Sequence, residues 1–285
     1  LLGSSMCEKV KHKTALISGA SSGIGYQCAD LLAQKGYDLI VIGKRAAKLE
    51  KAVQTLRQHP VIIYPLVLNL CEPDAAENVF SFCKVNHLHV DVLICNAGMN
   101  CVGQLMHTSP EEIIDILQLQ TLNPSLLCRY FGREMKKKGG GHILIVSSLT
   151  AYTPFPTLSL YAASKRYLHS FSKAIAAELK PFNVKVTDLC PGGVETDFFD
   201  NRGKFILLAM RFGLMMNARK VAEKGLNAMF KGKTYITPGW VNCLLIYMIH
   251  LLPRFCVAWL FNHTSLFANE TDSKYEQKNK YLNHE

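Results

Sequence analysis

The stretch TALISGASSGIG, from Thr14 to Gly25, decides the fold of this chain. Its first five residues, Thr14–Ser18, are mostly apolar, which is typical of a strand buried on both faces. Glycines follow at 19, 23 and 25, and a helical pattern begins there. Glycine lets the chain turn sharply and brings backbone N–H groups close to a phosphate at the start of the next helix. The stretch therefore predicts a strand–turn–helix unit that binds an anion.

Apolar runs alternate with helix-length segments along the chain. The predicted strands are Thr14–Ser18, Asp38–Gly43, Val61–Asn69, Asp91–Asn96, His142–Ser147 and Lys185–Cys190, with a short one near Tyr235–Thr237. The predicted helices are Gly25–Lys35, Ala46–His59, Ala75–Val85, Pro110–Lys138 and Ala162–Lys180, with another after Asn217. Repeated β-α-β units predict an α/β fold: a Rossmann-type, doubly wound parallel sheet in three α/β/α layers.

The composition limits the kinds of partner that the protein is expected to bind. Of the 285 residues, 49% are hydrophobic and 19% charged, so a large core is available. The net charge of +10 and the pI of about 9.1 suit an anionic ligand, an anionic membrane surface or nucleic acid. Because the Lys and Arg residues are scattered, with no zinc-finger spacing and no aromatic RNA-binding motif, we expect no nucleic-acid partner.

The ten cysteines include no pair at C-x-x-C spacing, and Cys71, Cys95 and Cys190 lie in apolar runs. Buried free thiols in a reducing compartment explain this pattern better than disulfides. No metal site is expected either, because the spacing of the histidines does not match that of metal ligands. The histidines considered are His87, His89, His107 and His142.

The N-terminal residues 1–12 are interpreted as a tag remnant and lead-in, since Leu1–Ser5 precede Met6 and resemble an expression scar. No apolar run precedes the first strand, so we expect no signal peptide and a location on the cytoplasmic side.

Two cations follow the second predicted strand, at Lys44 and Arg45. An acidic residue there would bind the ribose 2′-hydroxyl of NAD, whereas cations suit a 2′-phosphate. Since no Asp or Glu occurs between Leu39 and Lys48, NADP(H) is preferred over NAD(H). The alternative is that both cations are ordinary solvated charges on a loop.

Tyr161 and Lys165 share one face of a predicted helix, since they are four residues apart. An ammonium at ~4 Å, with an effective dielectric of ~20, attracts a phenolate by about 4 kcal/mol. That attraction lowers a tyrosine pKa from ~10 toward ~7, which suits a proton donor for a nascent alkoxide. A Tyr-x-x-x-Lys spacing on its own is more often an ordinary surface pair.

Several motifs found together are more specific than the Tyr-x-x-x-Lys spacing alone. Asn96-Ala97-Gly98 ends one predicted strand, Asn123 lies in the following helix, and Ser148 ends the next strand thirteen residues before Tyr161. With the glycine turn, this order and spacing resembles the short-chain dehydrogenase/reductase family, in its classical subgroup, from about Lys13 to Thr196.

The resemblance implies roles for four catalytic residues. Tyr161 would donate or accept the proton at the substrate oxygen, and Lys165 would lower its pKa and bind the nicotinamide ribose. Ser148 would hold the substrate carbonyl as a donor to developing charge. Asn123 would fix a water that links Lys165 to solvent.

The resemblance to the family also implies a cofactor site. The residues implied are Gly19, Ser21, Ser22, Gly23, Ile24 and Gly25 around the phosphates, Asn69, Leu70, Asn96, Ala97 and Gly98 along the adenosine, and Pro191, Gly192, Val194 and Thr196 at the nicotinamide. Two positions depart from the family: Ser18 stands for the usual Thr, and Asn69 for the usual Asp, which removes a charge from the adenine side.

The implied function is an NADP(H)-dependent oxidoreductase that reduces a ketone or oxidises the secondary alcohol. A non-catalytic NADP-binding sensor or scaffold is the alternative. Apolar residues in 149–160 and in a predicted substrate lid, 198–216, favour a hydrophobic carbonyl substrate such as an acyl chain or steroid-like ketone, unless they only pack the lid. The resemblance also suggests a homodimer or homotetramer through the helices Pro110–Lys138 and Ala162–Lys180.

We expect one dinucleotide-binding and catalytic domain, 13–239, then an apolar segment, 240–268, and a polar tail, 269–285. The apolar run Val241–Leu252 is shorter than the ~20 residues that span a bilayer. Residues 240–261 are therefore expected to pack on the cleft or on a partner subunit, or to rest on anionic lipid as a peripheral membrane contact.

Overall fold

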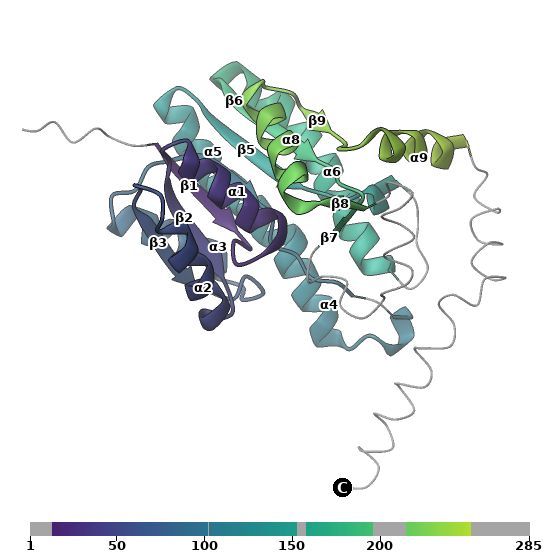
Figure 1. The fold of residues 1–285 in the computed structure, drawn as a ribbon. Coiled ribbons are helices and arrows are strands. Elements are labelled where there is room, and N and C mark those ends of the chain that lie inside the picture. Colours follow the sequence, from purple (N-terminus) through teal and green to yellow (C-terminus); the bar gives the residue numbers. More distant parts are fainter. Residues whose placement is uncertain (1–12, 102, 153–157, 196–214, 252–285) are drawn as a thin grey trace, which may run out of the picture.

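The computed structural model of the chain describes residues 13–101, 103–152, 158–195 and 215–251. Its centre is a parallel sheet of seven strands in the order β3-β2-β1-β4-β5-β6-β9 (Figure 1). The strands are β1 (Thr14–Ser18), β2 (Asp38–Gly43), β3 (Ile63–Val67), β4 (Val90–Cys95), β5 (Gly141–Val146), β6 (Val184–Leu189) and β9 (Tyr235–Ile236).

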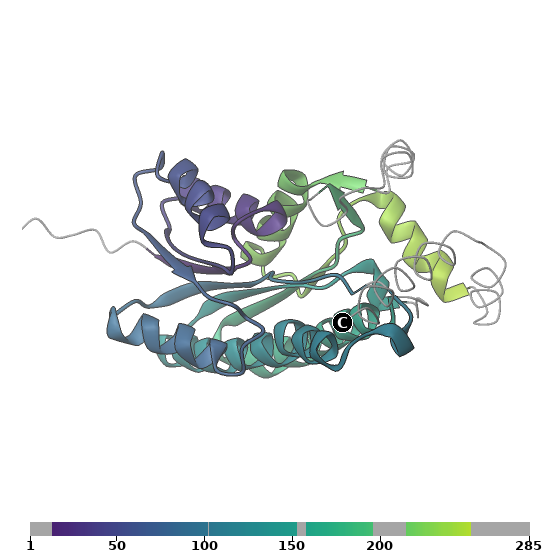
Figure 2. The same cartoon turned by 90° about the horizontal axis from the view of Figure 1, so that it is seen from below.

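Helices cover both faces of this sheet (Figure 2). One face carries α1 (Gly23–Gln34), α2 (Ala46–Leu56) and α8 (Ala218–Phe230), and the other carries α3 (Ala75–Val85), α5 (Asn123–Lys138) and α6 (Ser159–Leu179). The three-layer, doubly wound arrangement that the alternating pattern predicts is confirmed.

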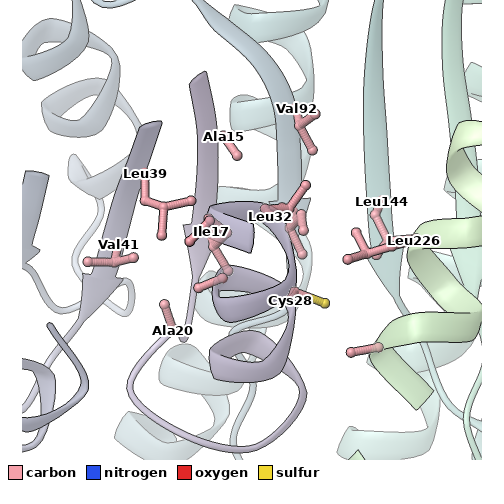
Figure 3. Close-up of a cluster of buried hydrophobic side chains, with 14 of the residues drawn as sticks. Ala15, Ile17, Ala20, Cys28, Leu32, Leu39, Val41, Val92, Leu144 and Leu226 are labelled. Carbon is pink, nitrogen blue, oxygen red and sulfur yellow. The ribbon is translucent and has the colours of Figure 1, made fainter. Parts of the chain in front are cut away.

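The central strands β1, β2 and β4 are mostly apolar because both of their faces are buried. In β2, Leu39 and Val41 pack into the cluster below α1, whereas Ile40 and Ile42 pack into the cluster on the opposite face. Figure 3 shows the first cluster, in which Leu32 of α1 meets the strand residues. Alternate residues of one strand thus hold both helical layers.

The third strand is shorter than predicted. It covers Ile63–Val67 rather than Val61–Asn69, pairs only with β2, and contains Pro65. Proline cannot donate a ladder hydrogen bond and is tolerated at a sheet edge. The unpaired side leaves Ile62 and Val67 exposed.

The predicted helix Pro110–Lys138 is wrong as a single element. It divides into α4 (Pro110–Leu117), a π-helical turn η2 (Gln118–Leu122) and α5, with the Asn123 N–H bonded to the Gln118 carbonyl. Pro124 explains the division, because it has no N–H for the Gln120 carbonyl and its ring crowds that turn. The predicted start of α4 is confirmed: Ser109 and Glu112 form a capping box.

The remaining elements are short or lie late in the chain. Leu105–His107, Leu149–Tyr152 and Lys180–Phe182 form 3-10 turns (η1, η3 and η4), and β7 (Gly193–Glu195) pairs in parallel with β8 (Met215–Asn217). Asn217 caps α8 through the Arg219 N–H.

Helix α9 (Trp240–Leu251) follows β9 and lies at one end of the molecule (Figure 1). The N-terminal segment, most of the predicted lid and the polar tail lie outside the described residues. Within those residues, no helix is long and apolar enough to cross a membrane.

Candidate active site

A cavity of about 700 Å³ opens at the carboxyl ends of the central strands. This edge is where an open parallel sheet binds its ligand. Most of the predicted site residues line it: Gly19, Ser21, Ser22, Gly23, Ile24, Lys44, Arg45, Asn69, Leu70, Asn96, Ala97, Gly98, Ser148, Tyr161, Lys165, Pro191, Gly192 and Val194. Gly25 and Asn123 are not in the lining, and Thr196 lies outside the described residues.

The glycine turn between β1 and α1 cannot accept side chains. Gly19 and Gly23 have φ of 66° and 58°, a conformation that favours glycine. A Cβ on Gly25 would lie 2.3 Å from the Gly19 carbonyl oxygen. The turn therefore closes on itself and presents backbone to the cavity.

Two side chains brace this turn: Ser18, at the end of β1, and Asn96, which follows the neighbouring strand β4. The Ser18 hydroxyl accepts the N–H groups of Asn96 (2.9 Å) and Ala97 (3.0 Å) and donates to the Ile94 carbonyl (3.2 Å). The Asn96 amide donates to the carbonyls of Ser18 (3.1 Å) and Gly19 (3.2 Å). Asn96 thus holds the shape of the turn as well as lining the cavity.

The residues present fit a dinucleotide pyrophosphate. Ser22, the N-cap of α1, makes no side-chain capping bond, so the first N–H groups of the helix remain as donors beside the cavity. The positive end of the helix dipole favours a phosphate at this point.

The adenosine end combines cations with a neutral amide. Lys44 and Arg45 are exposed side chains at the carboxyl end of β2. Asn69 uses its amide within its own loop, since it accepts the Cys71 N–H (3.2 Å) and donates to Glu72 (3.1 Å). The chemistry of this end suits an additional phosphate.

At the opposite end of the cavity, Ser148 and Tyr161 meet. Ser148 follows β5 and Tyr161 lies in the first turn of α6, and a side-chain hydrogen bond joins them. Burial raises the pKa of Tyr161 to about 12, while the bond with Ser148 acts in the lowering direction. The phenol is therefore protonated at neutral pH.

Lys165 lies one helical turn beyond Tyr161 and is buried. Its ammonium sits over the Tyr161 ring, 5.7 Å from the centroid, and donates to the Val146 carbonyl at 3.0 Å. Burial lowers its pKa to about 8, and Asp188 and Cys190 act in the opposite direction.

The predicted proximity of the ammonium to Tyr161 is confirmed in part, since it lies over the ring. The predicted lowering of the Tyr161 pKa toward ~7 differs from the value in this structure. The physical reason is that the ammonium bonds to a backbone carbonyl instead of the phenol oxygen, so desolvation of the phenol dominates.

Below Lys165 lies a buried carboxylate that the sequence analysis missed. Asp188 of β6 is fully buried, and one of its oxygens contacts His169 Nδ1 at 2.5 Å. His169 is one helical turn after Lys165, so the lysine, the histidine and the aspartate share the space between α6 and β6. A buried polar residue near the end of a strand was the available hint.

Asn123 makes structural bonds. Its amide accepts the Ala76 N–H (3.0 Å) and donates to the carbonyls of Leu70 (2.8 Å) and Glu72 (3.3 Å). It ties the loop after β3 to the start of α5. Gln120, which the sequence analysis did not select, lines the cavity instead.

Apolar side chains also line the cavity, namely those of Met99, Leu119, Leu149 and Leu158. Within the described stretches of the chain, no group of His, Cys, Asp or Glu is arranged to hold a metal ion. The eight cysteines found there are free thiols, six of them buried.

Comparison with known proteins agrees with this geometry. The family model described as short chain dehydrogenase matches residues 13–206. The protein named "Dehydrogenase/reductase SDR family member 4" from Bos taurus is 36% identical over 189 residues, 66% of this chain and 67% of that protein. Its Homo sapiens counterpart is 31% identical over 192 residues, 67% of this chain and 69% of that protein.

Solved structures share the fold. A short-chain dehydrogenase from Sphingobium yanoikuyae in complex with NADPH has a TM-score of 0.71 and 24% identity, over 80% of this chain and 88% of that one. L-Sorbose reductase from Gluconobacter frateurii, complexed with NADPH and L-sorbose, has a TM-score of 0.72 and 22% identity, over 80% of this chain and 96% of that one.

The chain therefore belongs to the short-chain dehydrogenase/reductase family. It is an NAD(P)-dependent oxidoreductase that acts on carbonyl and alcohol groups.

Proposed function

We propose that this protein is an NADPH-dependent reductase of a hydrophobic ketone, able to oxidise the corresponding secondary alcohol in reverse. The observation that carries the proposal is the convergence of Ser148, Tyr161 and Lys165 at one end of a cavity whose other end has a glycine turn and two cations. Binding and reaction thus share one crevice.

The side chains at the reacting end handle the proton. When bound, a dihydronicotinamide supplies a hydride to the carbonyl carbon. The Tyr161 hydroxyl donates its proton to the carbonyl oxygen, and Ser148 donates a hydrogen bond to the same oxygen as charge develops on it. A pKa of about 12 keeps the phenol protonated, which suits reduction.

Lys165 supports this step through its charge. The ammonium stabilises the phenolate left after proton transfer, because it lies over the ring in a buried site. It has donors beyond the one used by Val146, and these suit the hydroxyls of the nicotinamide ribose.

NADP(H) is proposed over NAD(H) because Lys44 and Arg45 stand at the adenosine end. Backbone of the glycine turn and of Ala97-Gly98 lines the path between, and Val194 stands near the nicotinamide end. Thr196, proposed to anchor the carboxamide, lies outside the described residues.

The substrate is proposed to be apolar because Leu119, Leu149 and Leu158 lie around the reacting end. Each buried methylene contributes about 0.8 kcal/mol, or roughly fourfold in affinity. We expect kcat/KM to rise along a series of ketones of increasing chain length; a flat series would contradict an apolar site.

The direct test is oxidation of NADPH in the presence of aliphatic, acyl-thioester and polycyclic ketones, with NADH in parallel. The proposal expects turnover with at least one ketone class and preference for NADPH. A non-catalytic sensor would bind NADPH, visible by fluorescence, without oxidising it in any of these mixtures.

Self-association is proposed through the outer surface of α4, η2 and α6, where Ile114, Leu117, Leu122 and Tyr167 are exposed. Light scattering of the purified protein checks this proposal. A monomer that shows no change with concentration would contradict it.

A peripheral membrane contact is proposed at α9. Trp240, Leu244 and Tyr247 are exposed at helical spacing, and no residue of the helix is acidic. Co-sedimentation with anionic vesicles should fall when Trp240 and Tyr247 are both changed to Ser. Equal sedimentation of both proteins would favour packing against a partner subunit.

A further inference from the structure

Gln120 occupies an unusual place in the backbone. It is the middle residue of the π-helical turn η2 and has no exposed surface. A π-turn redirects the side chains of its own residues relative to a regular helix, and such turns are frequent at functional sites. Here the redirection places a long amide in the cavity wall.

The orientation of that amide follows from its neighbour. The Ser164 hydroxyl donates its hydrogen to the Tyr161 carbonyl at 2.8 Å. It therefore accepts at 2.9 Å from Gln120, which makes the atom facing it the amide nitrogen Nε2. The amide oxygen Oε1 must point the other way.

Oε1 has no hydrogen-bond partner within the part of the chain that the structure describes. It lies 2.8 Å from the point that a Cβ on Gly98 would occupy, and Lys165 Nζ lies 3.6 Å from the same point. A buried acceptor and a buried ammonium with unused donors thus face one small space, bounded by Gly98.

We propose that Gln120 is a positioning residue for Lys165: its amide oxygen is the second acceptor of the ammonium, reached by a small shift of Nζ or through one water. Ser164 fixes the amide so that only the oxygen is presented.

The cost of burying an unpartnered amide oxygen favours a hydrogen-bonding role for Gln120 over a role in packing alone. A buried amide oxygen without a partner costs roughly 1–3 kcal/mol, whereas Leu or Met at the same point would cost nothing of the kind. The Asn123 amide, in contrast, makes three hydrogen bonds to backbone groups.

The test measures Lys165 directly. Protein carrying ¹⁵N-labelled lysine gives the pKa of Lys165 from the pH dependence of its side-chain nitrogen signal, which Lys165→Arg assigns. Gln120→Met removes the acceptor at similar volume, and Gln120→Glu replaces it with a charged one. The matched control is Gln118→Met, which makes the same change in the same turn, outside the cavity lining.

The expected shifts have opposite signs. Gln120→Met lowers the Lys165 pKa by about one unit, Gln120→Glu raises it by at least as much, and Gln118→Met leaves it unchanged. The other groups that act on Lys165, Asp188 and Cys190, are the same in all three proteins. Ser164→Ala, which frees the amide, lowers the pKa by less than Gln120→Met.

If both Gln120 variants shift the pKa in the same direction, or neither shifts it, the residue is structural and the inference is wrong. Should Gln120→Glu fail to fold, the pair Gln120→Met and Gln118→Met decides: equal pKa values contradict the inference. This proposal rests on the proposed function only for its catalytic consequence. In an active enzyme, kcat of Gln120→Met falls about tenfold with KM for NADPH little changed; absence of turnover in the unaltered protein would contradict the proposed function alone.

Discussion

The two ends of the cavity differ in what lines them: backbone at one end and buried side chains at the other. At the glycine turn, the wall is backbone, held by Ser18 and Asn96 through bonds that are all satisfied. At the other end, the buried side chains of Lys165 and Gln120 line the cavity. An oxygen of Gln120 and one of the nearby buried Asp188 have no hydrogen-bond partner among the described residues.

This difference separates binding from reaction. A rigid backbone wall, in which the first N–H groups of α1 remain as donors, suits a constant group such as a pyrophosphate, because it needs no rearrangement. Buried charges with bonds still to make respond to what is bound and to pH. We therefore expect changes at the glycine end to alter cofactor affinity, and changes at the Lys165 end to alter kcat and its pH dependence.

Tyr161→Phe should give the largest effect. It removes the proton donor while keeping the ring, so kcat/KM for ketone reduction should fall about a thousandfold, within the range of general acid catalysis. Fluorescence titration should show NADPH affinity within about threefold of the unaltered protein. An active variant would show that another group supplies the proton.

Removing the cations at the adenosine end should act on affinity alone. Lys44→Ala and Arg45→Ala should each weaken NADPH binding about tenfold and leave NADH binding nearly unchanged, since each loses a charge-assisted bond to the 2′-phosphate. Lys51→Ala, an exposed change on α2, is the control. Equal losses for both cofactors would contradict NADP selectivity.

Gly25→Ala tests the closed turn. Its Cβ would collide with the Gly19 carbonyl, so we expect about 1–3 kcal/mol lower stability and a clear loss of NADPH affinity. Thermal unfolding and fluorescence titration check both. Gly103→Ala, where a Cβ meets open space, should leave Tm unchanged. A stable, tightly binding Gly25→Ala protein would show that the turn can open.

The pH dependence of reduction needs no substitution. The Lys165 pKa is lowered from 10.5 to about 8, so its ammonium is present below that pH and is lost as the pH rises through it. Tyr161 stays protonated throughout this range. We expect kcat/KM to fall about tenfold between pH 7 and pH 9. A flat profile would mean that the ammonium does not assist the step.

The fold could be predicted because its signals are local. Apolar runs of strand length, a glycine turn and a capping box each depend on a few neighbouring residues, as in Thr14–Gly25. The same locality explains why most of the predicted cofactor-site residues line one cavity: they follow strand ends, and strand ends meet at one edge of the sheet.

The catalytic end was harder to predict because it depends on contacts between distant segments. Pro124 indicates a helix interruption, yet nothing local shows that the resulting turn brings Gln120 to Ser164, forty-four residues away. The pKa of Tyr161 likewise depends on its burial and on the hydrogen-bond acceptor of Lys165, which is the Val146 carbonyl in this structure. Spacing on one helix cannot supply either.

The most direct test of the central claim follows the hydride and the proton donor together. A ketone substrate is incubated with NADPH deuterated at C4 of the nicotinamide, and the alcohol is analysed by mass spectrometry. We predict one deuterium at the former carbonyl carbon with the unaltered protein and a rate about a thousandfold lower with Tyr161→Phe. An alcohol without deuterium, or equal rates for the two proteins, would contradict the account.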